Sequence, residues 1–152
     1  METREADQGS TTKERRTGSL ELIKKLTDER TEVLSLYCRV AGLRPFDDEK
    51  KDVHELLEQL CQMLVDYVAV GHFSLYERIV SGQERRQAVA DLAEKLYPRI
   101  SDTTEAVLDF NDKYNYKDNY PISNDFEEDL SVLGEIMAER IELEDQLLES
   151  MK

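Results

Sequence analysis

The chain has 152 residues, a length typical of one domain, with 34 acidic and 20 basic residues and a formal net charge of −14. A chain of this length buries roughly two thirds of its unfolded surface, so a sizeable hydrophobic core is available. The acidic balance argues against nucleic acid and anionic membranes as direct partners, because both are bound through basic surfaces. It favours a basic partner instead.

The lack of a visible targeting signal and the small number of cysteines indicate a cytoplasmic protein. The first residues, METREADQGSTTKERR, contain no apolar segment of the kind found in signal peptides. The sequence also contains no run of about 18 apolar residues, the length needed to cross a membrane. The two cysteines, Cys38 and Cys61, both lie in helical patterns. We expect two buried, reduced thiols, because a disulfide scaffold needs more cysteines in a shorter chain.

Residues 1–18 are polar, contain Gly, Ser and Thr, and show no apolar periodicity. This composition predicts a mobile tail ahead of a helical domain over residues 19–152. The charges of the segment nearly cancel, so it is not expected to be a basic arm for DNA.

The first helix is expected to begin at Ser19, whose side chain can cap it. Apolar residues then recur at helical spacing as far as Ala41, and Gly42 followed by Pro45 ends the pattern. Arg30 interrupts the apolar face. It is either a surface arginine whose aliphatic stem covers apolar neighbours, or the partner of a carboxylate between helices.

The most apolar stretch of the chain, residues 60–80 (LCQMLVDYVAVGHFSLYERIV), also carries ionisable residues. Its spacing is helical, and the predicted second helix begins at residues 47–48 and ends at residues 81–82. Gly71 lies inside the pattern, where glycine costs about 1 kcal/mol relative to alanine, and we expect a kink or a corner there. The stretch is either an ordinary core helix with polar residues at its edge or a recognition surface.

The third helix is expected from about Gln83 to Asp112. Pro98 lies inside it and should kink or split it, because proline removes one backbone hydrogen bond. Residues 113–121, KYNYKDNYP, are rich in Asn, Asp and Tyr and predict a turn.

Asn124 and Glu127 have the spacing of a capping pair for the last helix. Residues 124–149 contain ten acidic residues and one basic residue, Arg140, which should give the molecule one strongly negative side. No segment alternates with a period of two over the length of a strand. Four long amphipathic segments with short connections predict an all-α protein, an antiparallel four-helix bundle.

Motifs for metal binding and catalysis are nearly absent from the sequence. Neither histidine, His54 or His72, lies at the Glu-x-x-His spacing of a di-iron site, and His54 with Glu58 makes half a metal site at most. Nucleophile-elbow, Walker and dinucleotide-binding motifs do not occur. We therefore expect no enzyme activity, no metal and no cofactor.

A polar pocket inside the bundle is the alternative source of function. Arg140 and Glu144 are four residues apart, either as a surface pair worth a few tenths of a kcal/mol or as inward-facing groups that join His72, Tyr76 and Arg30. Buried polar groups cost stability, so such a pocket would suggest use. It would make the protein a small-molecule sensor or an enzyme. Another hypothesis is that the protein is a purely structural, oligomerising bundle.

The central sequence DYVAVGHFSLYERI resembles the signature of the Rsd/AlgQ family, bacterial regulators that bind the housekeeping sigma factor of RNA polymerase. The similarity covers about residues 20–148. Other segments that match in the same order are Arg30 with Leu34 and Tyr37, then GLRP (42–45), LYPRI (96–100) and AERIELEDQL (138–147). The resemblance implies a four-helix bundle with broken second and third helices.

The resemblance also implies an anti-sigma factor that regulates transcription, often in stationary phase. Its partner would be the C-terminal promoter-reading domain of sigma, whose helix-turn-helix presents a basic surface that an acidic protein complements. The chain would limit the association of sigma with core polymerase and promoter DNA, as a monomer in the complex. The family places the aspartate that matches Asp66 at the sigma interface. The full set of expected partner-binding residues is Asp66, Tyr67, His72, Phe73, Tyr76, Glu77 and Arg30.

Overall fold

The computed structural model describes residues 2–43, 51–76, 87–115 and 124–151, with the side chains of the first helix described from residue 20. It contains four α-helices and a single π-helical turn, and no strand occurs among the described residues, which confirms the predicted all-α bundle. The elements are α1 (Glu2–Ala41), α2 (Lys51–Val70), η1 (Gly71–Tyr76), α4 (Gln87–Tyr114) and α5 (Phe126–Ser150).

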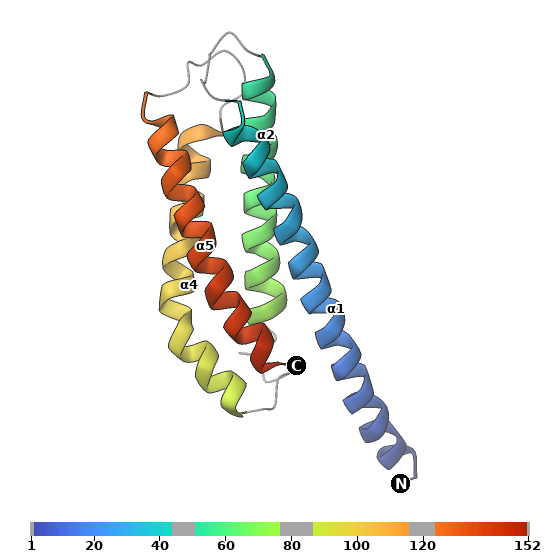
Figure 1. Cartoon of the computed structure of the whole chain (residues 1–152). Helices are drawn as coiled ribbons and strands as arrows, with labels where there is room; N and C mark the ends of the chain where they lie inside the picture. The colour runs from blue at the N-terminus through green and yellow to red at the C-terminus, as the bar shows by residue number, and fades with distance from the viewer. Residues whose placement is uncertain (1, 44–50, 77–86, 116–123, 152) are drawn as a thin grey trace.

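The helices form an up-and-down arrangement in which each neighbour in sequence runs the opposite way (Figure 1). The chain rises along α1, descends along α2, rises along α4 and descends along α5. Helix α1 packs chiefly on α2, α5 packs chiefly on α4, and α2 joins the two pairs through α4. The first part of α1 extends past the ends of the other helices (Figure 1).

The start of α1 differs from the prediction. The helix begins at Glu2 and runs through Ser19, which was predicted as its N-cap. Adding residues to a helix that already exists is far easier than nucleating a new one, so the packed part of α1 supports its continuation through a polar sequence. The division into a tail over residues 1–18 and a domain over residues 19–152 stays a prediction.

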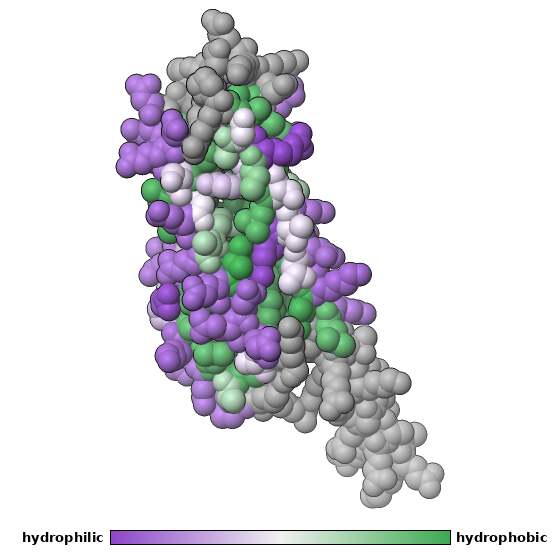
Figure 2. Space-filling model, in the orientation of Figure 1, coloured by the Kyte–Doolittle hydropathy of each residue, from purple (hydrophilic) through white to green (hydrophobic). Residues whose placement is uncertain are grey.

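Each helix contributes one apolar stripe to a common core. Figure 2 shows the result on one face, with apolar residues along the seams and hydrophilic residues over the outer sides. Cys61 is part of this core, and burial followed by the nearby Glu58 carboxylate raises the pKa of its thiol to about 12. Cys38 is exposed, contrary to the expectation of two buried thiols, because it points away from the stripe. Fully buried members of the core include Leu26, Val40, Leu60, Leu64, Leu75, Val107, Leu130, Leu143 and Leu147.

The two predicted helix breaks have different outcomes. At Gly71 the α-helix gives way to the π-helical turn η1, so the regular geometry does change where a kink was expected. A kink or a split was expected at Pro98, and the split does not occur, because α4 runs without interruption through this residue. Proline removes one hydrogen bond, and the buried Leu96 and Ile100 on either side hold the helix to the core. The predicted ends of the second helix lie outside the described residues.

The N-cap of the last helix differs from the prediction. The N-cap of α5 is Asp125 rather than Asn124, and its side chain makes no capping hydrogen bond. Three acidic residues in the first turn, Glu127, Glu128 and Asp129, still suit the positive end of the helix dipole. Asp129 also binds Lys113 Nζ at 2.7 Å and receives the hydroxyl of Tyr114, and these two contacts lower the pKa of its carboxyl group.

Helix α1 approaches α5 closely at one glycine. The Tyr37 hydroxyl on α1 donates a hydrogen bond of 2.7 Å to the carbonyl oxygen of Leu130 on α5. A Cβ atom at Gly134 would overlap this hydroxyl and lie 3.0 Å from Tyr37 Cζ. The absence of a side chain at Gly134 therefore gives Tyr37 room to cross to α5.

We expect Gly134→Ala to lower the free energy of unfolding by about 1–3 kcal/mol, as overpacking does. The loss should outweigh the advantage of about 1 kcal/mol that alanine has over glycine in a helix interior. Urea denaturation followed by circular dichroism measures the change. The control is Gly134→Ala in a Tyr37→Phe background, where the added methyl group should cost less. A rise in stability on Gly134→Ala alone would contradict the assigned contact.

Candidate functional site

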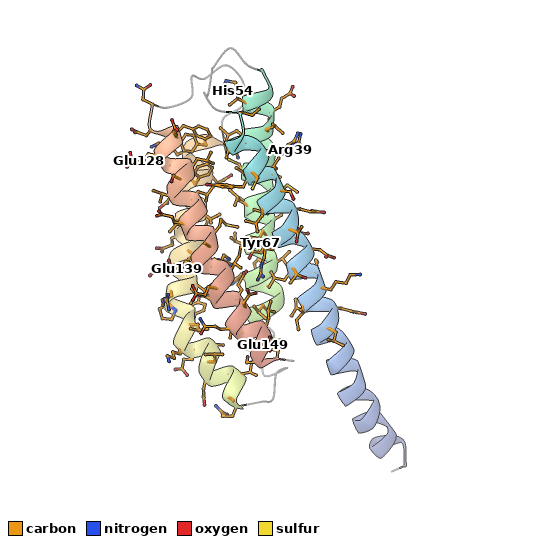
Figure 3. The ribbon with its side chains drawn as sticks, in the orientation of Figure 1. Arg39, His54, Tyr67, Glu128, Glu139 and Glu149 are labelled. Carbon is orange, nitrogen blue, oxygen red and sulfur yellow. The ribbon has the colours of Figure 1, made fainter. Side chains whose placement is uncertain are left out.

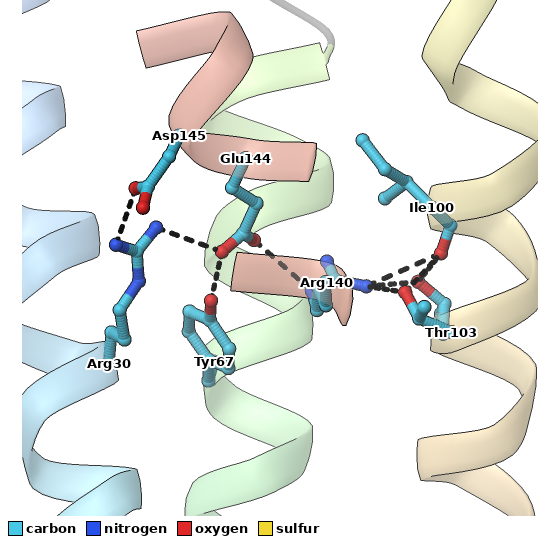
Figure 4. A network of polar contacts seen from close by, with 8 residues as sticks. Arg30, Tyr67, Ile100, Thr103, Arg140, Glu144 and Asp145 are labelled. Atoms are coloured by element: carbon cyan, nitrogen blue, oxygen red, sulfur yellow. Dashed lines mark hydrogen bonds and ion pairs between the residues drawn. The ribbon is translucent and has the colours of Figure 1, made fainter. Parts of the chain in front are cut away.

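A buried carboxylate, that of Glu144 on α5, is the centre of a polar network inside the bundle (Figure 4). Only 1% of its side chain is exposed. Oε1 of Glu144 accepts a hydrogen bond from the hydroxyl of Tyr67 on α2 and lies 3.3 Å from Nη2 of Arg30 on α1. Oε2 lies 3.1 Å from Nε of Arg140, one turn earlier on α5. Glu144 therefore joins three helices through donors that all face one carboxylate.

Arg140 connects the network to α4. Its side chain is also 1% exposed, and its Nη1 lies 2.7 Å from the hydroxyl of Thr104 and 3.1 Å from that of Thr103. The Ile100 carbonyl oxygen lies 3.5 Å from the same nitrogen. On the other side, the guanidinium carbon is 5.6 Å from the centre of the Tyr67 ring, a cation–π distance. With Arg140 included, the network spans all four α-helices.

The network brings groups of opposite charge together. Arg30 also binds the exposed Asp145 through Nη1 at 2.7 Å, so two guanidinium groups face two carboxylates. Burial by itself would lower the pKa of Arg30, but its contacts with Asp145, Tyr67 and Glu144 raise it above the usual value. Burial and then the Glu144 carboxylate raise the pKa of Tyr67. Tyr67 therefore stays protonated and donates to Glu144.

The backbone of η1 lies directly against this ion pair. Gly71 is buried, and a Cβ atom there would lie 2.9 Å from Nη2 of Arg140 and 3.4 Å from Oε2 of Glu144. The first of these distances is shorter than ordinary van der Waals contact. Glycine at this position lets the first residue of the π-helical turn rest on the charged groups.

The network contains three of the five residues predicted for an inner polar pocket. Arg30, Arg140 and Glu144 meet between helices. His72 is exposed on η1, where its ring meets Phe73 edge-on at 4.9 Å between centroids, and it makes no contact with the network. The side chain of Tyr76 lies outside the described part of the chain.

Sequence reasoning missed Tyr67 as the hydroxyl of this network. Its position contained the signal, because Leu60, Leu64, Tyr67 and Gly71 follow one another at helical spacing on the inward face of α2. The tyrosine was instead assigned to partner binding. It is fully buried, so its side chain is not accessible to an incoming protein.

The remaining partner-binding candidates divide by exposure. Asp66 is exposed and its Oδ1 accepts a hydrogen bond of 3.1 Å from Gln62, one turn earlier. Phe73 is 63% exposed, an unusual position for a large apolar side chain. Arg30 has 12% of its side chain exposed and is already paired with two carboxylates, which leaves little of it for a partner. Glu77 lies outside the described residues.

Two hollows of the described surface lie away from the buried network. A shallow one of about 800 Å³ lies along α5 and a smaller one of about 250 Å³ lies between α4 and α5. Arg140, Glu144 and Tyr67 line neither hollow. Within the described ranges, no three His, Cys, Asp or Glu side chains are grouped so as to hold a metal ion, and no helix is long and apolar enough to span a membrane. The polar groups of the network pair mainly with one another, although the buried Nε of Arg30 has no hydrogen-bond partner among the described residues.

We expect Glu144→Gln to lower the free energy of unfolding by about 3–5 kcal/mol, because it leaves buried guanidinium groups without their counter-charge. The matched control is Glu139→Gln on the same helix. Glu139 also pairs with an arginine, Arg99 at 3.4 Å, but both side chains are largely exposed. That change should cost less than about 1 kcal/mol. Equal losses for the two variants in urea denaturation would show that Glu144 is not a buried ionic centre.

Comparison with known proteins agrees with the family resemblance. The sequence model of the family described as "Regulator of RNA polymerase sigma(70) subunit, Rsd/AlgQ" matches residues 6–152. The Regulator of sigma D of Yersinia enterocolitica is 36% identical over 138 residues, which cover 87% of this chain and 81% of that protein. The Regulator of sigma D of Salmonella paratyphi B is 34% identical over 140 residues, covering 89% and 84%. No solved structure gives a significant match. The chain therefore belongs to the Rsd/AlgQ family of regulators of the sigma-70 subunit of RNA polymerase.

Proposed function

We propose that this protein is a cytoplasmic anti-sigma factor that binds the promoter-reading C-terminal domain of the housekeeping sigma factor. By covering that domain it limits the association of sigma with core RNA polymerase and with promoter DNA. Family membership supports sigma as the partner. The pairing of the inner polar groups with one another argues against the alternative of a sensor or enzyme built on an inner pocket.

The recognition face that we propose consists of Asp66, His72 and Phe73, exposed residues in the segment that resembles the family signature, together with the exposed Gln62 one turn before Asp66. The observation that supports it is the combination of an exposed carboxylate with a large exposed aromatic ring. Asp66 and Phe73 are seven positions apart, about two turns along one helical rod. Binding energy in protein interfaces is concentrated in a few aromatic and charged residues of this kind.

Electrostatics supports a basic partner. The net charge is −14, and acidic side chains, among them Glu128, Glu139 and Glu149, extend along α5 (Figure 3). A DNA-reading helix presents Arg and Lys to phosphates and bases, so a protein of this charge attracts the same surface. The attraction raises the association rate and disfavours acidic partners. We infer that one monomeric chain binds one sigma domain in this way.

We expect Asp66→Asn to weaken binding to the sigma C-terminal domain about tenfold or more, because losing one member of an interfacial charge pair costs about 2–5 kcal/mol. An arginine of the DNA-reading helix is the expected partner, since it can bind a carboxylate through two parallel hydrogen bonds. Fluorescence anisotropy of a labelled sigma domain measures the dissociation constant. The melting temperature should change little, because Asp66 is exposed.

The matched control for Asp66 is Asp91→Asn on α4. Asp91 is also exposed and also accepts a hydrogen bond from a glutamine one turn earlier, Gln87, at 2.8 Å. Asp91 lies outside the recognition face, so the Asp91→Asn variant should bind sigma with the affinity of the parent protein. Parental affinity of Asp66→Asn would remove Asp66 from the interface. A large drop in its melting temperature would instead assign it to the stability of the bundle.

A second prediction concerns salt. If the acidic surface attracts sigma, the association rate measured by stopped-flow should fall as sodium chloride rises, because the screening length shortens from about 10 Å at 0.1 M to about 3 Å at 1 M. The dissociation rate should change less, since contacts inside the interface are screened less. An association rate that does not depend on salt would mean that the interface is chiefly apolar.

A further inference from the structure

We propose that Gly71 and the Arg140–Glu144 ion pair position the exposed residues of η1 for sigma binding, although none of the three touches the partner. The inference rests on the proposed function, because His72 and Phe73 belong to the recognition face. It gives buried residues a role in binding, although their lack of exposure means that they cannot contact sigma themselves.

The π-helical turn is the first observation behind this proposal. In an α-helix each N–H bonds to the carbonyl four residues earlier, whereas in a π-helix it bonds five residues earlier. The wider turn changes the direction in which the following side chains leave the helix. Here it begins at Gly71 and includes His72 and Phe73. The orientation of these two side chains relative to Asp66 therefore depends on whether the π-helical turn is maintained.

The second observation is what the inner side of the turn contacts. Gly71 is buried against Arg140 Nη2 and Glu144 Oε2, where an added Cβ would lie 2.9 Å and 3.4 Å from these atoms. Four residues later Leu75 is fully buried in the core. The turn is thus held at two inward points while His72 and Phe73 project outward between them.

The third observation is that the ion pair is itself fixed from several directions. Thr103 and Thr104 on α4 hold Arg140, and Tyr67 on α2 and Arg30 on α1 hold Glu144. Apolar residues of similar size commonly stabilise a core as well as or better than a buried ion pair does. What the pair adds is direction, because its hydrogen bonds allow one position of the guanidinium group beneath Gly71. This is the property that a positioning role requires.

The test is a double-mutant cycle between Gly71→Ala and Phe73→Ala, read out as binding of the sigma C-terminal domain. We expect Phe73→Ala to weaken binding about tenfold or more, as loss of an aromatic anchor does. Gly71→Ala should weaken it at least about fivefold. Because Gly71 acts through the orientation of Phe73, the double variant should bind within about twofold of Phe73→Ala alone, a coupling expected of residues that act together.

Two further variants separate positioning from loss of stability. Gly134→Ala also places a methyl group against a polar side chain, but that side chain is Tyr37 of α1, and Gly134 is six residues before Arg140 along α5. This variant should therefore lower the melting temperature and leave sigma affinity unchanged. Thr104→Val removes one hydroxyl from Arg140 and is milder than a change at Gly71. It should weaken binding about two- to threefold with the same coupling to Phe73→Ala. It keeps the test decisive should Gly71→Ala fail to fold.

Three outcomes would overturn the inference. Parental affinity of both Gly71→Ala and Thr104→Val would show that the ion pair has no influence on the recognition face. If the losses of sigma affinity in Gly71→Ala and Thr104→Val add to the loss in Phe73→Ala, the effect belongs to stability. The same holds if Gly134→Ala loses as much sigma affinity as they do. Parental affinity of both Phe73→Ala and Asp66→Asn is a different failure, because it removes the recognition face itself and with it the proposed site.

Discussion

The bundle depends on one buried carboxylate. Glu144 removes its charge from water only because Tyr67, Arg140 and Arg30 supply donors from three helices. A buried ion pair contributes little net stability compared with apolar packing, yet it is intolerant of losing one member. This constraint fixes the relative position of the helices. The inner faces of α1, α2 and α5 must meet where the donors can reach the same two oxygens, and α4 must offer its threonines to Arg140.

Much of the fold was predictable because the apolar stripes are regular and the helices are long. Helical spacing correctly indicated that these segments are helices, and Gly71 marked the place where α2 changes geometry. The start of α1 was missed because a polar composition describes only the conformation that isolated residues prefer. It does not describe how readily a packed helix continues into them. Pro98 was overweighted for a similar reason, since flanking buried residues hold α4 together.

The candidate site was predictable in part. Arg140 and Glu144 are spaced four apart beside an apolar stripe, and Arg30 interrupts another stripe, which left inward polar groups as one of two alternatives. Which other residues join them depends on the rotation of α2 about its axis. The spacing of Leu60, Leu64 and Tyr67 placed Tyr67 on the inward face, but the prediction took His72 as the inward polar residue. The structure places Tyr67 inside and His72 outside.

The span of the network also determines how the protein should unfold. Tyr37 and Arg30 attach α1 to α5 through hydrogen bonds, while the remaining packing of α1 is chiefly on α2. A helix held mainly by apolar contact at one seam is a candidate to separate first. Here its departure would also strip a donor from Glu144, which adds about 1–3 kcal/mol or more to the cost of exposing the apolar seam. The network therefore couples the opening of α1 to the groups that hold the other described helices together, and it raises the cooperativity of unfolding.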